Sequence, residues 1–238
     1  EQSTYQIEGH GLEALVSASE IANSDSPYSA LTDSVLGLTS QLILEKEKTL
    51  GTTLGDTAIL TSNATLSGTA QWSDFSNSDP IGDSATARST IMDGCGAPPN
   101  AAIMSWQVWN KLRFSSKLLD ALGYKYNKMG GLSEDELAVA LGVEKIIRSD
   151  AMYENAAEGQ TSDLEPCFGK NCIFAVVPDR AMPYQVSLGY RIQQSAPRRV
   201  YKYAVNNPPN SQSVLVEDNY DLFLSNVKAA YLVKNCIA

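Results

Sequence analysis

One apolar stripe between residues 27 and 50 constrains the fold more than any other feature of this sequence. Its members recur at spacings of four, three and four residues, the period of one helical face: Leu31, Val35, Leu38 and Leu42. Pro27 at the first helical position, with Ser26 as N-cap, predicts the start, and Gly51 predicts a stop after about Leu50. The helix would be roughly 35 Å long, which is long for a domain of this size.

Outside this stripe, helical and strand patterns alternate as far as residue 177, and the remainder is rich in strand patterns. Helices are expected at 80–93, from Trp106 onwards, and after a Ser133–Glu136 capping box, and the helix at 80–93 should break at Gly94 and Gly96. The expected strands are 101–105, 145–148, 172–177 and five further segments after residue 190. A polar loop is expected at 161–170. The fold class is therefore α+β.

Composition excludes several functions. Hydrophobic residues make up 43% and charged residues 19% of the 238 residues, which is typical of a globular protein. Lys and Arg number 18 against 27 Asp and Glu, and a net charge of −9 opposes tight, sequence-specific nucleic-acid binding. The sequence has no apolar run of the roughly 20 residues that span a bilayer, so no membrane association is expected.

Candidate catalytic groups are few. His10 is the only histidine, so a Ser-His-Asp or Cys-His relay would have to use it. It lies between two glycines near the start of the chain, where a histidine is far more often a surface residue. A glycosidase would instead need two carboxylates about 5–10 Å apart. The sequence offers three pairs: Glu134 with Glu136, Asp163 with Glu165, and Glu217 with Asp218.

Each carboxylate pair also has a simpler structural explanation. The first pair belongs to a helix N-terminus, the second to an exposed loop and the third to a turn. The four cysteines do not indicate a zinc site, because only Cys167 and Cys172 are close in sequence (CFGKNC) while Cys95 and Cys236 stand alone. We therefore predict no catalytic residue, no metal and no cofactor, and we keep a carbohydrate-acting hydrolase as the alternative from a different class.

Two other segments are candidates for contacts. QWSDFSNSDPI, at residues 71–81, places Trp72 and Phe75 among Ser, Asp and Asn, with Asp79 as an N-cap candidate. Either an active-site loop or a surface that grips another copy of the chain would explain this. Basic residues concentrate only at Arg198-Arg199 with Lys202, and at Lys125 and Lys128 beside Tyr124 and Tyr126. A solvated or intersubunit patch is the more common role of such groups, and a nucleic-acid surface the less common one.

The order of the motifs adds a resemblance to a known family. The main motif is LSGTAQWSDFSNSDPI, at residues 66–81. A second motif, YQIEGHGLEALVSASEIANSD, lies upstream of it. The others follow in order: PPNAAIMSWQVWNKL (98–112), LSEDELAVALGVEKIIRSDAMYENAAEGQT (132–161), FGKNCIFAVVP (168–178), SLGYRI (187–192) and YLVKN (231–235). Together they resemble the tailed-phage major capsid proteins of the Hong Kong 97-type fold.

The resemblance implies a division of the chain into named parts. Residues 1–26 would be the returning strand of an extended loop and its lead-in. Residues 27–79 would be the peripheral domain with its spine helix, 80–215 the axial domain, and 216–238 strands that return to the peripheral domain. In the family, an N-terminal arm and an ascending loop strand come before the segment that begins at residue 1. Either the chain would have been cleaved after them, or the sequence would be partial.

The resemblance also implies a function. The chain would be a structural protein, not an enzyme, whose hexamers and pentamers form an icosahedral shell around double-stranded DNA. Its partners would be other copies of itself, with scaffolding, portal and decoration proteins, in a virion assembled in the host cytoplasm. Trp72 and Phe75 would anchor a subunit contact or cap the domain junction, and Asp79, Arg198 and Arg199 are further assembly candidates. An encapsulin-type nanocompartment shell is the alternative within the same fold.

Overall fold

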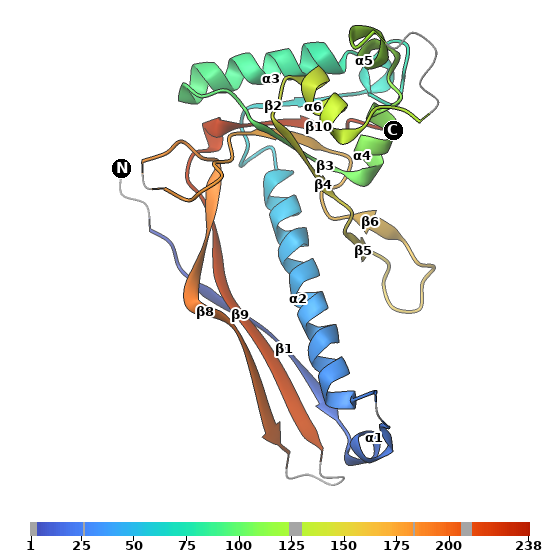
Figure 1. Ribbon diagram of the computed structural model, residues 1–238, viewed down its shortest axis with the longest axis vertical. Helices are drawn as coiled ribbons and strands as arrows, with labels where there is room; N and C mark the ends of the chain where they lie inside the picture. Colours follow the sequence, from blue (N-terminus) through green and yellow to red (C-terminus); the bar gives the residue numbers. More distant parts are fainter. Residues whose placement is uncertain (1–3, 26, 124–129, 183, 206–210) are drawn as a thin grey trace. The chain divides into compact units, whose positions relative to one another are not determined.

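The computed structural model describes residues 4–25, 27–123, 130–182, 184–205 and 211–238 (Figure 1). The chain forms two compact units, which we describe separately. Unit 1 comprises Glu1–Lys46 and Arg191–Phe223, and unit 2 comprises Glu47–Tyr190 and Leu224–Ala238. The predicted N-cap Ser26 and the basic group around Lys125 and Lys128 lie outside the described residues.

Unit 1 contains a three-stranded sheet in the order β1-β9-β8. Its strands are β1 (Glu8–Val16), β8 (Gly189–Ala204) and β9 (Gln212–Leu224). β1 runs antiparallel to β9, with Glu8 opposite Tyr220 and Val16 opposite Gln212. The short helix α1 (Ala18–Asn23) begins with a capping box between Ser17 and Glu20. The sheet thus joins the first described residues to segments near the end of the chain.

The long helix α2 spans Ala30–Leu54, and its first part belongs to unit 1. Leu38 and Leu42 of the predicted stripe are buried against Val216 of β9, with Leu12 and Ala14 of β1 packed beside them. The helix and its apolar face are therefore confirmed. The predicted bounds were wrong at both ends.

Local hydrogen bonds explain the later start of α2. The Tyr28 amide donates to the Asp25 carbonyl at 2.9 Å, so Pro27 lies in a turn, and the Asp33 amide donates to the Ser29 carbonyl at 2.9 Å. At the other end Gly51 is a helical residue and not a stop. A Cβ on Gly51 would lie only 2.1 Å from the Cys167 carbonyl oxygen, so this glycine permits a close approach of two backbones.

Unit 2 is built on a five-stranded sheet in the order β2-β10-β7-β3-β4. The strands are β2 (Asn63–Thr65), β3 (Ala101–Ser105), β4 (Lys145–Ser149), β7 (Cys172–Ala175) and β10 (Ala230–Lys234). β7 is antiparallel to both β3 and β10, whereas the β2–β10 and β3–β4 pairs are parallel. All four residues of β7 are buried, which fits a central strand covered on both faces.

Besides the end of α2, the described part of unit 2 contains four further helices and a hairpin. The helices are α3 (Pro80–Cys95), α4 (Trp106–Leu112), α5 (Ser116–Ala121) and α6 (Glu134–Leu141), with short 3-10 turns at Gly68–Ala70 and Val227–Ala229. β5 (Met152–Glu154) and β6 (Leu164–Pro166) form an antiparallel hairpin. One continuous core includes Trp72, Ile91, Met104, Leu137 and Phe174.

Most local predictions in unit 2 are confirmed. The strand at 101–105 leads directly into α4, and α6 has its Ser133–Glu136 capping box and a left-handed Gly142 with φ of 70°. Helix α3 runs two residues longer than expected and ends at Gly96, with φ of 74°. The segment expected to be a loop at 161–170 contains β6, because its residues pair with β5.

The strand-rich tail contains fewer and longer strands than predicted. The five expected segments form three strands, since YRIQQ and all of RRVYKYAV except Val205 lie within β8, and SVLVED and YDLFL lie within β9. The α+β class is confirmed. Within the described ranges, no helix combines the length and apolar character needed to cross a bilayer.

Candidate functional site

The loop that leads into α3 contains three of the five predicted assembly residues. Trp72 is fully buried in the core of unit 2. Its indole Nε1 donates to Asp83 Oδ2 at 2.8 Å, and its backbone amide donates to the Cys236 carbonyl at 2.6 Å. Buried indole N–H groups usually find such a partner. Trp72 therefore fixes the loop to α3 and to the C-terminal segment.

The polar residues of this loop bond mainly to one another. Asp74 Oδ1 accepts from the amides of Ser76 and Asn77 at 3.1 Å each, and Asp74 Oδ2 accepts from Asn77 Nδ2 at 2.9 Å. The bonds from Asn77 hold the pKa of Asp74 below its usual value. This Asx-type turn explains the Ser, Asp and Asn content of the segment.

Phe75 and Asp79 face solvent, unlike Trp72. Phe75 is 37% exposed, and its carbonyl accepts a bond from the Ser116 amide at 3.3 Å. Asp79 stands at the N-cap of α3 but makes no capping hydrogen bond with its side chain. Its Oδ1 lies 3.6 Å from Lys117 Nζ. The loop thus presents one aromatic ring and one carboxylate at the surface of unit 2.

Asp83 was not predicted as a site residue, and only the fold reveals its role. Burial raises the pKa of its carboxyl above the usual value, with Asp79 adding to the rise, while the bond from Trp72 and the charge of Lys117 oppose it. A raised carboxyl pKa means that the folded state binds the proton more tightly than the unfolded chain does. This contribution to stability is present at low pH and is lost as pH rises through the folded-state pKa.

We expect Asp83→Asn to flatten the pH dependence of stability above about pH 4, the ordinary Asp pKa. The amide oxygen can still accept the Trp72 bond, so this change removes the buried charge without removing the acceptor. Thermal melts between pH 4 and 8 would measure the pH dependence of stability of the variant. Asp93→Asn, at an exposed position of the same helix, is the control. A variant whose stability still falls with pH as in the wild type would refute this role of Asp83.

The other two predicted residues, Arg198 and Arg199, lie on β8 of unit 1. Both are exposed. Arg198 Nη2 lies 3.6 Å from Asp218 Oδ2, the same oxygen that Lys46 Nζ contacts at 2.5 Å, and Asp218 itself is buried. Alternation along the strand points Arg199 to the opposite face, where a bond with Tyr201 raises its pKa. These arginines belong to unit 1, whereas the Trp72 loop belongs to unit 2.

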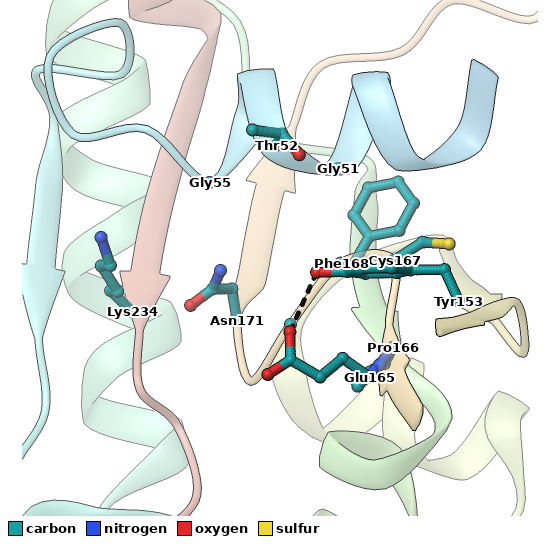
Figure 2. Close-up of a pocket in the computed structure, with 11 residues that line it drawn as sticks. Gly51, Thr52, Gly55, Tyr153, Glu165, Pro166, Cys167, Phe168, Asn171 and Lys234 are labelled. Atoms are coloured by element: carbon teal, nitrogen blue, oxygen red, sulfur yellow. Dashed lines mark hydrogen bonds between the residues drawn. The ribbon is translucent and has the colours of Figure 1, made fainter. Parts of the chain in front are cut away.

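An open pocket of about 240 Å³ lies in unit 2 beside the last turn of α2 (Figure 2). Tyr153 Oη donates to Glu165 Oε2 at 2.9 Å, a bond that raises the pKa of Tyr153, and Lys48 Nζ lies 3.7 Å from the Tyr153 ring. Burial raises the pKa of the Cys167 thiol, so this sulfur is a poor nucleophile. Among the described side chains of this lining, Tyr153 and Glu165 pair with each other, and no described hydrogen bond joins the thiol of Cys167 to a base.

The three carboxylate pairs also have structural partners. Glu136 closes the capping box of α6, and Glu134 accepts from Arg148 at 2.6 Å. Glu165 is bound by Tyr153. The prediction that the third pair lies in a turn is wrong. Glu217 and Asp218 lie inside β9, and Asp218 is buried against Lys46.

His10 and the cysteines make no catalytic constellation in the described part of the chain. His10 lies within β1, not in a flexible segment, and stacks on Tyr220 with ring centroids 4.5 Å apart. Cys167, Cys172 and Cys236 are buried free thiols, and Cys95 is half-buried. Among the described residues, no three His, Cys, Asp or Glu side chains gather as a metal site would require.

This combination of elements is the Hong Kong 97-type fold found in phage capsid proteins, as comparison with solved structures shows. A phage-related protein from Bordetella bronchiseptica RB50 matches 98% of this chain and 77% of its own, with a TM-score of 0.77 and 24% identity. The capsid structure of Cyanophage P-SCSP1u matches 95% of this chain and 71% of its own, with a TM-score of 0.59 and 8% identity. The expected fold is confirmed.

Two further comparisons concern a curated relative and another solved structure. A protein named "Major capsid protein" from Pseudomonas phage JBD67 is 27% identical over 173 residues, 72% of this chain and 54% of that protein. The chain therefore spans about half the length of this relative. The holo-SrpI encapsulin complex of Synechococcus elongatus PCC 7942 matches 97% of this chain and 74% of its own, with a TM-score of 0.58 and 13% identity. No family model matches the chain.

Proposed function

We propose that this chain is a major capsid protein of a tailed phage and that its copies assemble into a closed icosahedral shell. The similarity to the Pseudomonas phage protein over 72% of the chain carries the proposal, because it is a similarity of sequence as well as of fold. The role is structural and not enzymatic. This agrees with carboxylates that are engaged in caps and ion pairs and with a pocket that has no free nucleophile–base pair.

The exposed apolar side chains support self-association. Tyr28, Leu36, Phe75, Val139 and Leu164 are among the large hydrophobic residues with more than a third of their surface exposed. Heterologous contacts generate closed rings when the rotation closes, and rings of this kind are the units from which the proposed shell would be built. Phe75, Asp79, Arg198 and Arg199 remain candidates for such contacts, whereas the burial of Trp72 supports a role inside the subunit.

We further propose the division that the resemblance implies: 1–26 as the returning strand of an extended loop, 27–79 as the peripheral domain, 80–215 as the axial domain, and 216–238 as strands that return to the peripheral domain. The two compact units divide the chain at other positions. The α2–sheet packing in unit 1 supports a spine-helix role for α2. The shell would enclose double-stranded DNA as part of the virion, and the net charge of −9 suits a wall that holds DNA without binding it tightly. Scaffolding, portal and decoration proteins are further proposed partners, with assembly in the host cytoplasm.

The second candidate is an encapsulin-type shell that encloses a protein cargo. The observation that favours it is the fold comparison, in which the TM-scores to the encapsulin and to the cyanophage capsid are 0.58 and 0.59. Fold alone therefore does not separate the two. The contents of purified particles do: nuclease-protected DNA supports the capsid, and a single enclosed protein species supports the encapsulin.

Particle size tests the shell against the hydrolase alternative. We expect the purified protein to sediment as megadalton assemblies, with little material at the 25.7 kDa of one chain. Analytical ultracentrifugation in buffers from low to high salt would measure the distribution. A stable monomer or small oligomer that hydrolyses glycosidic bonds would contradict the shell and support the enzyme.

A further inference from the structure

Strand β8 presents a largely exposed surface in unit 1, although Arg198 pairs with Asp218 and the Tyr203 hydroxyl donates to Glu13. It is an edge strand of the three-stranded sheet (Figure 1). From Arg198 to Ala204 every residue is exposed, although successive side chains of a strand point to opposite faces. We call residues 198–203, with the sequence RRVYKY, the basic strand. Both of its faces are available for contact.

The residues of the basic strand are typical of an interface. Val200, Tyr201 and Tyr203 are 51%, 41% and 45% exposed, and three cationic residues lie among them. Tyr and Arg are enriched in protein interfaces, where they bury apolar surface and donate hydrogen bonds. Exposed apolar side chains that gather on one surface commonly mark an interaction site. The basic strand is therefore a candidate for a contact with a partner.

Its charge determines what kind of partner fits. Two basic strands from different copies would place Arg and Lys opposite like charges, which is unfavourable in a sheet. Charged residues along an edge also oppose the addition of a further strand. The occupant must therefore be acidic, and it must contact the side chains and not the strand edge.

The same chain carries a segment with these properties in unit 2. Between residues 150 and 166, which include the β5–β6 hairpin, five acidic residues occur and no Lys or Arg. Glu158 and Asp163 are exposed, and no ion pair joins either to another described residue. Leu164 beside them is 57% exposed. We call residues 154–165 the acidic hairpin.

We infer that the acidic hairpin of one copy binds the basic strand of a second copy. This inference rests on the proposed shell and names one of its contacts. Opposite charges would steer and align the two surfaces, and Leu164 would pack on the exposed Val200 or Tyr201. A nucleic acid is the other class of ligand that basic and aromatic side chains bind. The hairpin is favoured because the chain has a net charge of −9 and already contains an acidic and apolar partner.

Charge reversal tests the contact. Arg199→Glu/Lys202→Glu reverses the basic strand without touching Arg198, which contacts the buried Asp218 at 3.6 Å. Glu158→Lys/Asp163→Lys reverses the hairpin. We expect each double variant to lower the assembled fraction by about tenfold or more, since like charges then face each other across the contact. We expect the variant that combines all four substitutions to regain an assembled fraction within about twofold of the wild-type value.

Controls separate this contact from charge and folding effects. Asp93→Lys/Asp120→Lys adds the same charge as the hairpin variant at other exposed sites of unit 2 and should assemble normally. Melting curves should match wild type throughout. The inference is overturned if either reversal assembles normally, or if the combination is no better than its parents. It is also overturned if the basic-strand variant loses only enclosed DNA. A wild type that never assembles would contradict the shell as well.

Discussion

The Trp72→Ala variant is expected to lose about 3–5 kcal/mol of folding stability, the range for removing a large aromatic side chain from a core. Trp72 is fully buried and belongs to the main core of unit 2. The change also removes the donor to Asp83, which lies 2.8 Å from the indole nitrogen. Because the net stability of a domain is only about 5–15 kcal/mol, this loss is a large fraction of it, and we expect a lower melting temperature and a lower yield of folded subunits. Chemical denaturation would measure the loss.

Two companion variants divide this effect into its causes. Trp72→Phe keeps most of the apolar volume but removes the indole N–H, so it isolates the Asp83 bond and should cost less. Phe75→Ala truncates the exposed aromatic of the same loop and should change stability by less than about 1 kcal/mol. A Trp72→Ala protein that melts like wild type and fails only to assemble would show that Trp72 acts at an interface instead.

Replacing Gly51 with alanine is expected to destabilise unit 2 by about 1–2 kcal/mol. The new Cβ would lie 2.1 Å from the Cys167 carbonyl oxygen and 3.2 Å from the Phe168 Cα, as their adjacent positions in Figure 2 suggest. Both are backbone atoms, so one segment must move, and overpacking of this kind typically costs about 1–3 kcal/mol or somewhat more. The helix-propensity gain of about 1 kcal/mol offsets only part of this cost.

Gly37 on the same helix provides the matched control. An added Cβ there meets no atom within 4 Å. Gly37→Ala should therefore stabilise the protein by about 0.5–1 kcal/mol, through helix propensity alone. Opposite signs for the two variants in thermal melts are the expected result. If both substitutions stabilise the protein, the close approach of α2 to the Cys167 segment would be disproved.

Features coded by short-range patterns could be predicted from the sequence. The apolar stripe predicted α2, the Ser133–Glu136 box predicted the start of α6, and the AAIMS segment predicted β3. In each case the residues that determine the helix or strand lie within a few positions of one another or recur at a regular spacing. Local patterns alone predicted only the α+β class. The prediction of the overall fold came from the resemblance to capsid proteins.

Features that depend on distant contacts could not be predicted. Gly51 resembles a helix stop until the fold brings the Cys167 backbone against it. Glu217 and Asp218 resemble turn residues until Lys46 of α2 pairs with Asp218. Trp72 lies in a polar stretch without periodicity, and its burial depends on the C-terminal segment, whose Cys236 carbonyl accepts its amide. No property of the separate segments reveals these pairings.

Electron cryo-microscopy of the purified native particles tests the central claim most directly. We predict closed shells whose wall consists of rings of five and six copies of this chain, each with the sheets and the α2 helix described above. The same maps would reveal whether the acidic hairpin reaches the basic strand of a neighbour. Dispersed single subunits, or shells whose wall density does not accommodate this fold, would contradict the proposal.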